Sequence, residues 1–275
     1  MTRVAIIAAM PGELKPLVRG WRHESRNGVE LWRFAFLDDK GDQVECIAAC
    51  AGAGMQAATR AFAEAGRDGA LSLAISTGWA GALSSGFEPG LAYRVSEVVD
   101  ARTGERFEAA DWVAQDRDEP THPSRKNNDA ARVGHPALSH VEHPDLCLVT
   151  SPKVADQAEK LRLAEAYAAG LVDMEAAAVA RLAAMRGIPF ACIKGVSDGF
   201  GEQLPDFNRF ISDNGKFQLL RFVVFVLLRP GHWPALIRMG ENSKQASQSL
   251  AECVFDFLDE RGHIRKRNGY PNIKP

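Results

Sequence analysis

Three carboxylates stand where buried strands are predicted to end. Glu13 follows the apolar run 4–10, Glu175 follows "GLVDM", and Asp198 follows the apolar run 190–196. Ligands of open α/β sheets bind beyond the carboxyl ends of the strands, so these side chains are placed to share one pocket. Buried acids in one pocket can divide general-acid and general-base roles. Each acid taken alone also fits an ordinary turn or helix-start position.

The elements that must position these acids alternate along the chain. Continuous apolar runs are typical of strands that helices cover on both faces. The alternation predicts an α/β fold, a single-domain three-layer sandwich with a central mixed β-sheet flanked by helices. Strands are expected at 4–10, 44–50, 71–77, 146–150 and 190–196, an antiparallel insertion at 30–39, and helices at 55–66, 174–187, 207–228 and 234–262.

One domain is expected to span residues 1–262. Within it, residues 116–145 have little periodicity and are interpreted as a long surface excursion. Residues 205–262 are expected to form C-terminal helices, and the basic polar tail 263–275 is expected to be mobile. The apolar run 219–228 contains an arginine and is much shorter than the ~20 residues of a membrane span.

The composition excludes several classes of partner. The formal charge is −2, so no nucleic acid partner is expected. The five cysteines are scattered without a CxxC pair, which favours a reduced, cytoplasmic chain, and the first residues do not resemble a signal segment. His135, His140 and His143 fit no standard zinc spacing, so neither a metal nor another cofactor is expected.

Five motifs in order carry a resemblance to a known family. They are "AIIAAMPGE", "AGAGMQAATRA", "ISTGWAGAL", "VDMEAAAVA" and "IKGVSDG", which together span residues 4–200. With them the chain resembles the nucleoside phosphorylase superfamily, and most closely the methylthioadenosine/S-adenosylhomocysteine nucleosidases. The second motif also fits the dinucleotide pattern G-x-G-x-x-A, but it follows a later strand, and the next strand ends without the acid that a nicotinamide site needs.

The resemblance implies a role for each acid. The acid at the position of Glu13 activates a water that attacks the anomeric carbon of the sugar, and the acid at Asp198 protonates the purine at N7. Glu175 would hold the ribose hydroxyls and Met174 would pack against the sugar. The resemblance also implies that Ser197 orients Asp198 and the base. Such a division suits a bond that breaks through an oxocarbenium-like state.

The turn "TGWAGAL" is expected to border the substrate through Gly78 and Trp79. Trp79 stands where the nucleosidases usually have a small residue beside the catalytic water. Its indole is therefore expected either to reshape the pocket or to turn against neighbouring structure. Residues 148–157 contain no aromatic residue, although the family places a phenylalanine against adenine in this segment.

These motifs favour hydrolysis over phosphorolysis. A phosphorylase binds an anion beside the sugar, and Glu13 would repel phosphate there. Arg19 is expected to lie well into the helix that follows, away from the nucleophile. The resemblance implies a small nucleoside as the substrate, water as co-substrate and a homodimer or larger homo-oligomer.

Other functions stay open. One is a phosphate-dependent phosphorylase, and another is an enzyme for a larger adenosyl compound such as a hopanoid precursor, because the C-terminal helices exceed what a standard nucleosidase needs. A third, of another class, is a nucleoside-binding protein without turnover. For the run 219–228, burial in the core or in a dimer is favoured over contact with a membrane.

Overall fold

The computed structural model describes residues 1–38, 41–110, 140–141, 145–202, 206–210, 218 and 233–260. The predicted excursion 116–145 therefore lies outside the described residues except for 140–141 and 145. The apolar run 219–228 and the tail 263–275 also lie outside them. In the described part, no helix is both long enough and apolar enough to cross a membrane.

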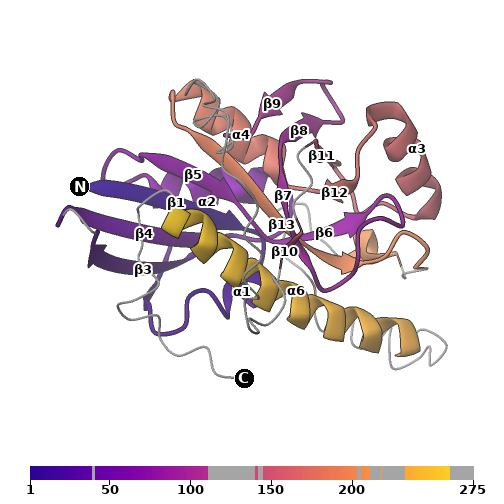
Figure 1. Ribbon diagram of the computed structural model, residues 1–275, viewed down its shortest axis with the longest axis horizontal. Helices are drawn as coiled ribbons and strands as arrows, with labels where there is room; N and C mark the ends of the chain where they lie inside the picture. Colours follow the sequence, from indigo (N-terminus) through magenta and orange to yellow (C-terminus); the bar gives the residue numbers. More distant parts are fainter. Residues whose placement is uncertain are drawn as a thin grey trace, which may run out of the picture.

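A large mixed β-sheet forms the centre of the fold, as predicted (Figure 1). Within the described residues it has thirteen strands, eleven of them in the order β2-β3-β4-β1-β5-β13-β6-β12-β11-β8-β9, while β7 pairs with β10 and β13. The strands are β1 Thr2–Ala8, β2 Arg22–Arg26, β3 Val29–Leu37, β4 Gln43–Cys50, β5 Leu73–Ser76, β6 Trp79–Ala82, β7 Ala92–Val95, β8 Glu97–Asp100, β9 Arg106–Glu108, β10 His140–Val141, β11 Cys147–Thr150, β12 Leu171–Asp173 and β13 Phe190–Asp198.

Helices cover both faces of this sheet. The described helices are α1 Pro11–Leu14, α2 Met55–Ala65, α3 Gln157–Tyr167, α4 Ala176–Met185 and α6 Trp233–Glu260, with a 3-10 turn at Phe207–Phe210. In Figure 1, α6 runs along one face, whereas α2 and α4 lie on the opposite face. The result is the three-layer arrangement that the alternating pattern predicts.

The period-two geometry of the strands divides the core between these two layers. In β1, Val4 and Ile6 pack in a cluster with residues of α6, whereas Ala5 and Ile7 pack in a second cluster with residues of α2 and α4. Because both faces are covered, β1 is apolar along almost its whole length. That is why it reads as a continuous run in the sequence.

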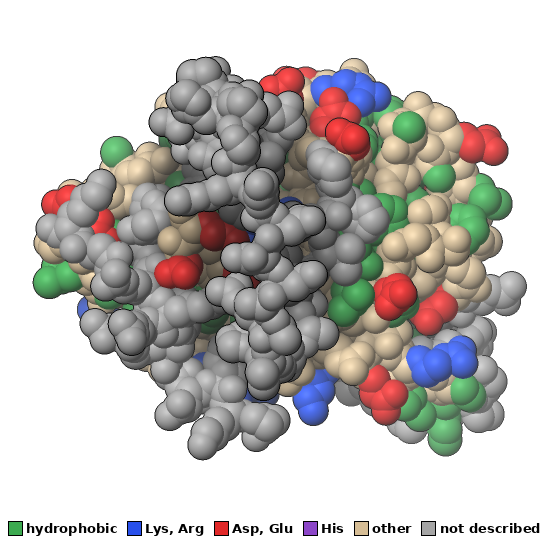
Figure 2. Space-filling view, viewed as in Figure 1, with side chains coloured by type: hydrophobic (Ala, Val, Ile, Leu, Met, Phe, Trp, Pro, Cys, Tyr) green, Lys and Arg blue, Asp and Glu red, His purple; other side chains and the backbone are tan. Residues whose placement is uncertain are grey.

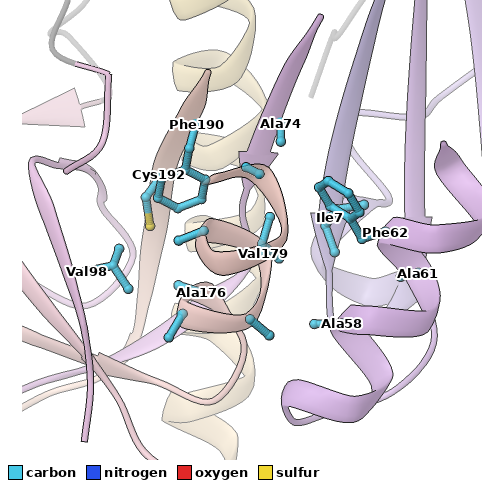
Figure 3. Close-up of a cluster of buried hydrophobic side chains, with 14 of the residues drawn as sticks. Ile7, Ala58, Ala61, Phe62, Ala74, Val98, Ala176, Val179, Phe190 and Cys192 are labelled. Atoms are coloured by element: carbon cyan, nitrogen blue, oxygen red, sulfur yellow. The ribbon is translucent and has the colours of Figure 1, made fainter. Parts of the chain in front are cut away.

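Small side chains allow α2 and α4 to pack closely on the sheet. Figure 3 shows Ala176 and Val179 of α4 beside Ala58, Ala61 and Phe62 of α2 in this buried cluster. All five side chains are buried. The alanine-rich sequence of α4 is therefore a packing feature, and the acids just before it need a separate explanation.

Two boundaries near the predicted acids differ from the expectation. Strand β13 extends through Asp198, so this acid ends the strand itself. Helix α4 begins at Ala176, and Glu175 is its N-cap residue, although its side chain makes no capping hydrogen bond. The predicted antiparallel pairing of β3 with β4 is confirmed. Helix α3 and the short strands β6 to β9 and β12 were not predicted.

Candidate active site

A cavity of about 1240 Å³ opens where the carboxyl ends of several parallel strands meet. Strand β1 pairs in parallel with β4 and β5, and β13 pairs in parallel with β5. Glu13 follows β1, and Asp198 ends β13. Both line the cavity together with Glu175, so the structure brings the three predicted acids to one site.

Three backbone N–H groups hold the carboxylate of Glu13. Its Oε2 accepts hydrogen bonds of 2.8 Å from the N–H groups of Ala9 and Met10, and its Oε1 accepts one of 2.9 Å from Trp79. Burial raises the pKa of Glu13, while these hydrogen bonds and the nearby Lys194 act in the opposite direction. A rigid carboxylate with a raised pKa is suited to accept a proton.

Gly78 leaves room for the carboxylate of Glu13. Its φ of +114° lies in the region that favours glycine, and a Cβ atom there would come within 2.9 Å of Oε1 of Glu13. A larger residue would strain the turn and push the carboxylate from its place. Gly78 was predicted to border the substrate, and the structure places it against Glu13.

Glu175 reaches across to the loop after β4. Its Oε1 accepts a hydrogen bond of 2.6 Å from the N–H of Gly54, and its Oε2 accepts one of 3.2 Å from Met174. Burial, and then the negative charge of Asp173, raise the pKa of Glu175 to about 8. Glu175 therefore carries a proton over much of the neutral range, and Met174 lines the cavity beside it.

Asp198 accepts hydrogen bonds at both carboxylate oxygens. Oγ of Ser197 donates to Oδ1 at 2.8 Å, and Nζ of Lys160 lies 2.5 Å from Oδ2. Lys160 comes from α3, an element that the sequence did not predict, and its side chain is only 3 % exposed. The structure thus adds a buried cation to an acid for which only Ser197 was expected as a partner.

A second buried ion pair lies at the cavity. Nζ of Lys194 is 2.8 Å from Oδ2 of Asp173, and both side chains are fully buried. Asp173 also accepts hydrogen bonds from Thr150 Oγ1 and from the N–H of Ala176. Burial acts to lower the pKa of Lys194, but the negative charge of Asp173 together with Cys192 and Glu175 outweighs it, so the pKa is raised. This pair brings a fixed positive charge near Glu13 and Glu175.

Helix α6 forms part of the cavity wall. Leu236, Met239 and Ser247 of this helix line the cavity, and Nε1 of Trp79 donates a hydrogen bond of 3.0 Å to Oγ of Ser247. The indole therefore turns against neighbouring structure, which is one of the two outcomes expected for Trp79, and it still lines the cavity.

Exposed cations also line the cavity. Lys15, Arg19, Lys153 and Lys244 have exposed side chains and no ion-pair partner in the part of the chain that the structure describes. The expectation that Arg19 lies within a helix is wrong, because α1 ends at Leu14 and Arg19 follows in a turn. Its side chain is thus available to an anion in the cavity, such as the phosphate that a phosphorylase would bind.

No group of three or more potential metal ligands occurs among the described residues. The side chains of His135, His140 and His143 lie outside them, so the expectation that these histidines bind no metal stays a prediction.

Figure 2 shows acidic and basic side chains interspersed over the described part of one face, without a broad patch of either sign.

The family is decided by a sequence profile. The profile of the Phosphorylase superfamily matches residues 3–218, which include all the predicted site residues. The chain belongs to the phosphorylase superfamily. No curated protein matches the chain significantly.

Solved structures of superfamily enzymes share the fold at low sequence identity. The 5′-methylthioadenosine/S-adenosylhomocysteine nucleosidase of Helicobacter pylori with butyl-thio-DADMe-Immucillin-A is 14 % identical, with a TM-score of 0.63, covering 94 % of this chain and 99 % of that one. The Neisseria meningitidis nucleosidase with methylthio-immucillin-A is 19 % identical over the same shares, with a TM-score of 0.62. A futalosine hydrolase mutant of Helicobacter pylori is 14 % identical, with a TM-score of 0.63, covering 94 % and 100 %.

Proposed function

We propose that this superfamily member is a purine nucleosidase that hydrolyses the N-glycosidic bond of an adenosyl-type nucleoside, of the methylthioadenosine or S-adenosylhomocysteine kind. One observation carries the proposal: Glu13, a buried carboxylate held by three N–H groups, lines one cavity together with Asp198 and Glu175. The fold shared with the Helicobacter pylori and Neisseria meningitidis nucleosidases supports it.

Glu13 is the base that activates water. Each carboxylate oxygen has two lone-pair directions. Oε2 already accepts from Ala9 and Met10, whereas Oε1 accepts only from Trp79 among the described residues. One acceptor position is therefore left for a water molecule, which Glu13 would deprotonate as it attacks the anomeric carbon.

The other acids serve the two halves of the nucleoside. Asp198, with Ser197 and Lys160, faces the leaving base, which must gain a proton as the glycosidic bond breaks. Glu175 holds the ribose hydroxyls, and Met174 packs against the sugar. Protonated over much of the neutral range, Glu175 can both donate to a hydroxyl and accept from one.

The first experiment measures free base released from methylthioadenosine, S-adenosylhomocysteine, adenosine and inosine, with and without phosphate. Release of adenine at the same rate without phosphate is expected. Strict phosphate dependence would make Glu13 the wrong base and would assign Arg19 and Lys15 to an anion beside the sugar. Binding of a nucleoside without release of any base would instead favour a nucleoside-binding protein without catalytic activity.

A second candidate is a nucleoside with a larger 5′ substituent. The cavity of about 1240 Å³ exceeds the roughly 300–1,000 Å³ of common small-molecule sites, and Leu236 and Met239 of α6 give it an apolar wall. A series of 5′-alkylthioadenosines of rising chain length tests this idea. A kcat/KM that rises with length, and that falls for the long members in Met239→Trp, would favour the larger substrate.

A further inference from the structure

We propose that Lys160 is the proton donor to the departing base, and that Asp198 is its fixed counter-ion. The assignment rests on the proposed N-glycosidic cleavage and changes which side chain supplies the proton. It comes from the arrangement of donors and acceptors around Asp198.

The hydrogen bonds of Asp198 leave little place for a transferable proton. Lys160 is a donor only, so Oδ2 of Asp198, 2.5 Å from its Nζ, must act as an acceptor. A proton on Oδ2 would point at an ammonium group. The other oxygen, Oδ1, accepts the hydroxyl of Ser197 at 2.8 Å. Both oxygens of Asp198 are thus engaged as acceptors, which is the pattern of an ionised carboxylate.

Lys160 has a proton to give. Its ammonium group carries three N–H donors. One meets Asp198 and a second meets the backbone oxygen of Gly199 at 3.0 Å, which leaves the third without a partner among the described residues. Lys160 lines the cavity although its side chain is 3 % exposed.

Helix α3 and Gly81 position the Lys160–Asp198 pair. Lys160 lies one turn into α3, and the N-cap residue Asp156 bonds the N–H of Glu159 with its side chain. The lysine side chain passes over Gly81, where a Cβ atom would come within 3.4 Å of Cε of Lys160 and 3.1 Å of Oδ2 of Asp198. Both groups are therefore held in one place by packing.

The proton balance of the reaction then closes within the site. The C–N glycosidic bond breaks with its electron pair moving to the base, and one N–H proton of Lys160 passes to a ring nitrogen. Water adds OH to the anomeric carbon, and its other proton goes to Glu13. The cycle ends when Glu13 loses a proton to solvent and Lys160 regains one. Asp198 stays ionised throughout and stabilises the ammonium form between turnovers.

The competing interpretation is that Lys160 only orients Asp198. The two tests answer different questions. A leaving group that needs no proton shows whether Lys160 acts on leaving-group protonation at all, because both a proton donor and a residue that orients the donor lose their importance there, and the arginine variant separates these two roles. An arginine keeps the positive charge and the ion pair but does not give up its proton. Arginine can therefore replace a lysine that only orients Asp198, but it cannot replace a lysine that donates a proton.

The experiment compares a purine nucleoside that the protein cleaves with 4-nitrophenyl riboside, whose nitrophenolate leaves without protonation. For Lys160→Met, we expect kcat on the purine nucleoside to fall by about 10²–10⁴-fold and on the aryl riboside by less than about threefold. Lys160→Arg should lose a similar factor on the purine nucleoside. The matched control is Arg162→Met, an exposed change on α3 that removes only the ion pair with Glu159.

Equal losses on both substrates in Lys160→Met, or full purine activity in Lys160→Arg, would overturn the assignment while leaving the proposed function in place. If the wild-type protein does not cleave the aryl riboside, the activity of Lys160→Arg on the purine nucleoside decides alone: a large loss supports the assignment and full activity overturns it. A wild-type protein that releases no base from any nucleoside would instead refute the proposed function, and this assignment with it.

Discussion

Nε1 of Trp79 donates a hydrogen bond of 3.0 Å to Oγ of Ser247, which lies 168 residues further along the chain. The bond joins the first residue of β6 to helix α6, and both side chains line the cavity. Ser247 in turn donates to the backbone oxygen of Ser243 at 2.9 Å. Trp79 therefore connects Glu13, which accepts its backbone N–H, to the part of the cavity wall that α6 forms.

We expect Ser247→Ala to lower the free energy of unfolding by about 1 kcal/mol, because the partly buried indole N–H loses its partner. Trp79→Phe should have a larger effect, since it also removes contact area. In a double-mutant cycle measured by urea unfolding, the two changes should be coupled by about 0.5–1.5 kcal/mol. Additive effects would mean that the hydrogen bond adds nothing to stability.

Glu13→Gln should lower kcat by about 10²–10⁴-fold, because an amide cannot take a proton from water. Glutamine also presents an NH₂ group to one of the backbone N–H groups that now donate to Glu13, so some loss of stability is expected as well. Affinity for a transition-state analogue and the unfolding midpoint should be measured together. Glu30→Gln, on the edge hairpin, is the control; a Glu13→Gln enzyme with normal kcat would exclude Glu13 as the base.

Much of the fold could be predicted because the central strands are buried on both faces. Strand β13 is buried along its whole length and β4 along most of it, each contains a run of mainly apolar residues, and α2 has a clear amphipathic pattern. Strands β6 and β12 have only four and three residues, too few for periodicity to appear. Helix α3 buries only Lys160 and Leu163, so its pattern is weak.

The acids of the site could be predicted from their places at strand ends, whereas neither of the two lysines was predicted. The signal for Lys194 was present: it is a single charge inside the apolar run 190–196, and a buried charge requires a partner. Lys160 gave no such signal, because a lysine in a polar helical segment normally faces solvent. Its partner Asp198 lies 38 residues away and is brought near only by the fold.

The raised pKa of Glu175 predicts how stability changes with pH. Its pKa is 4.5 in the unfolded chain and about 8 when folded, so between these values the folded state binds more protons than the unfolded state. Stability therefore falls as pH rises from about 4.5 to 8, and this contribution is constant above and below that window. Glu175→Gln stays neutral throughout and should not share the fall.

Thermal unfolding of wild type and Glu175→Gln at pH 5, 6, 7 and 8 tests this relation. The midpoint of the variant should rise relative to that of wild type with each step. Glu13, whose pKa is also raised, contributes to both proteins in the same direction and largely cancels in the comparison. Parallel midpoints across the series would show that Glu175 does not titrate in this window.

The buried pair Lys194–Asp173 predicts an asymmetric response to single and double changes. Lys194→Met leaves the fully buried charge of Asp173 without its cation, which should destabilise the protein by about 3–5 kcal/mol. Asp173→Asn in the same chain removes that charge and should recover a large part of the loss, since Thr150 Oγ1 can still donate to the amide oxygen. Urea unfolding of both variants gives the two values. If the double variant is no more stable than Lys194→Met, the lysine supports the fold through packing of its side chain, and the ion pair is not the reason for its burial.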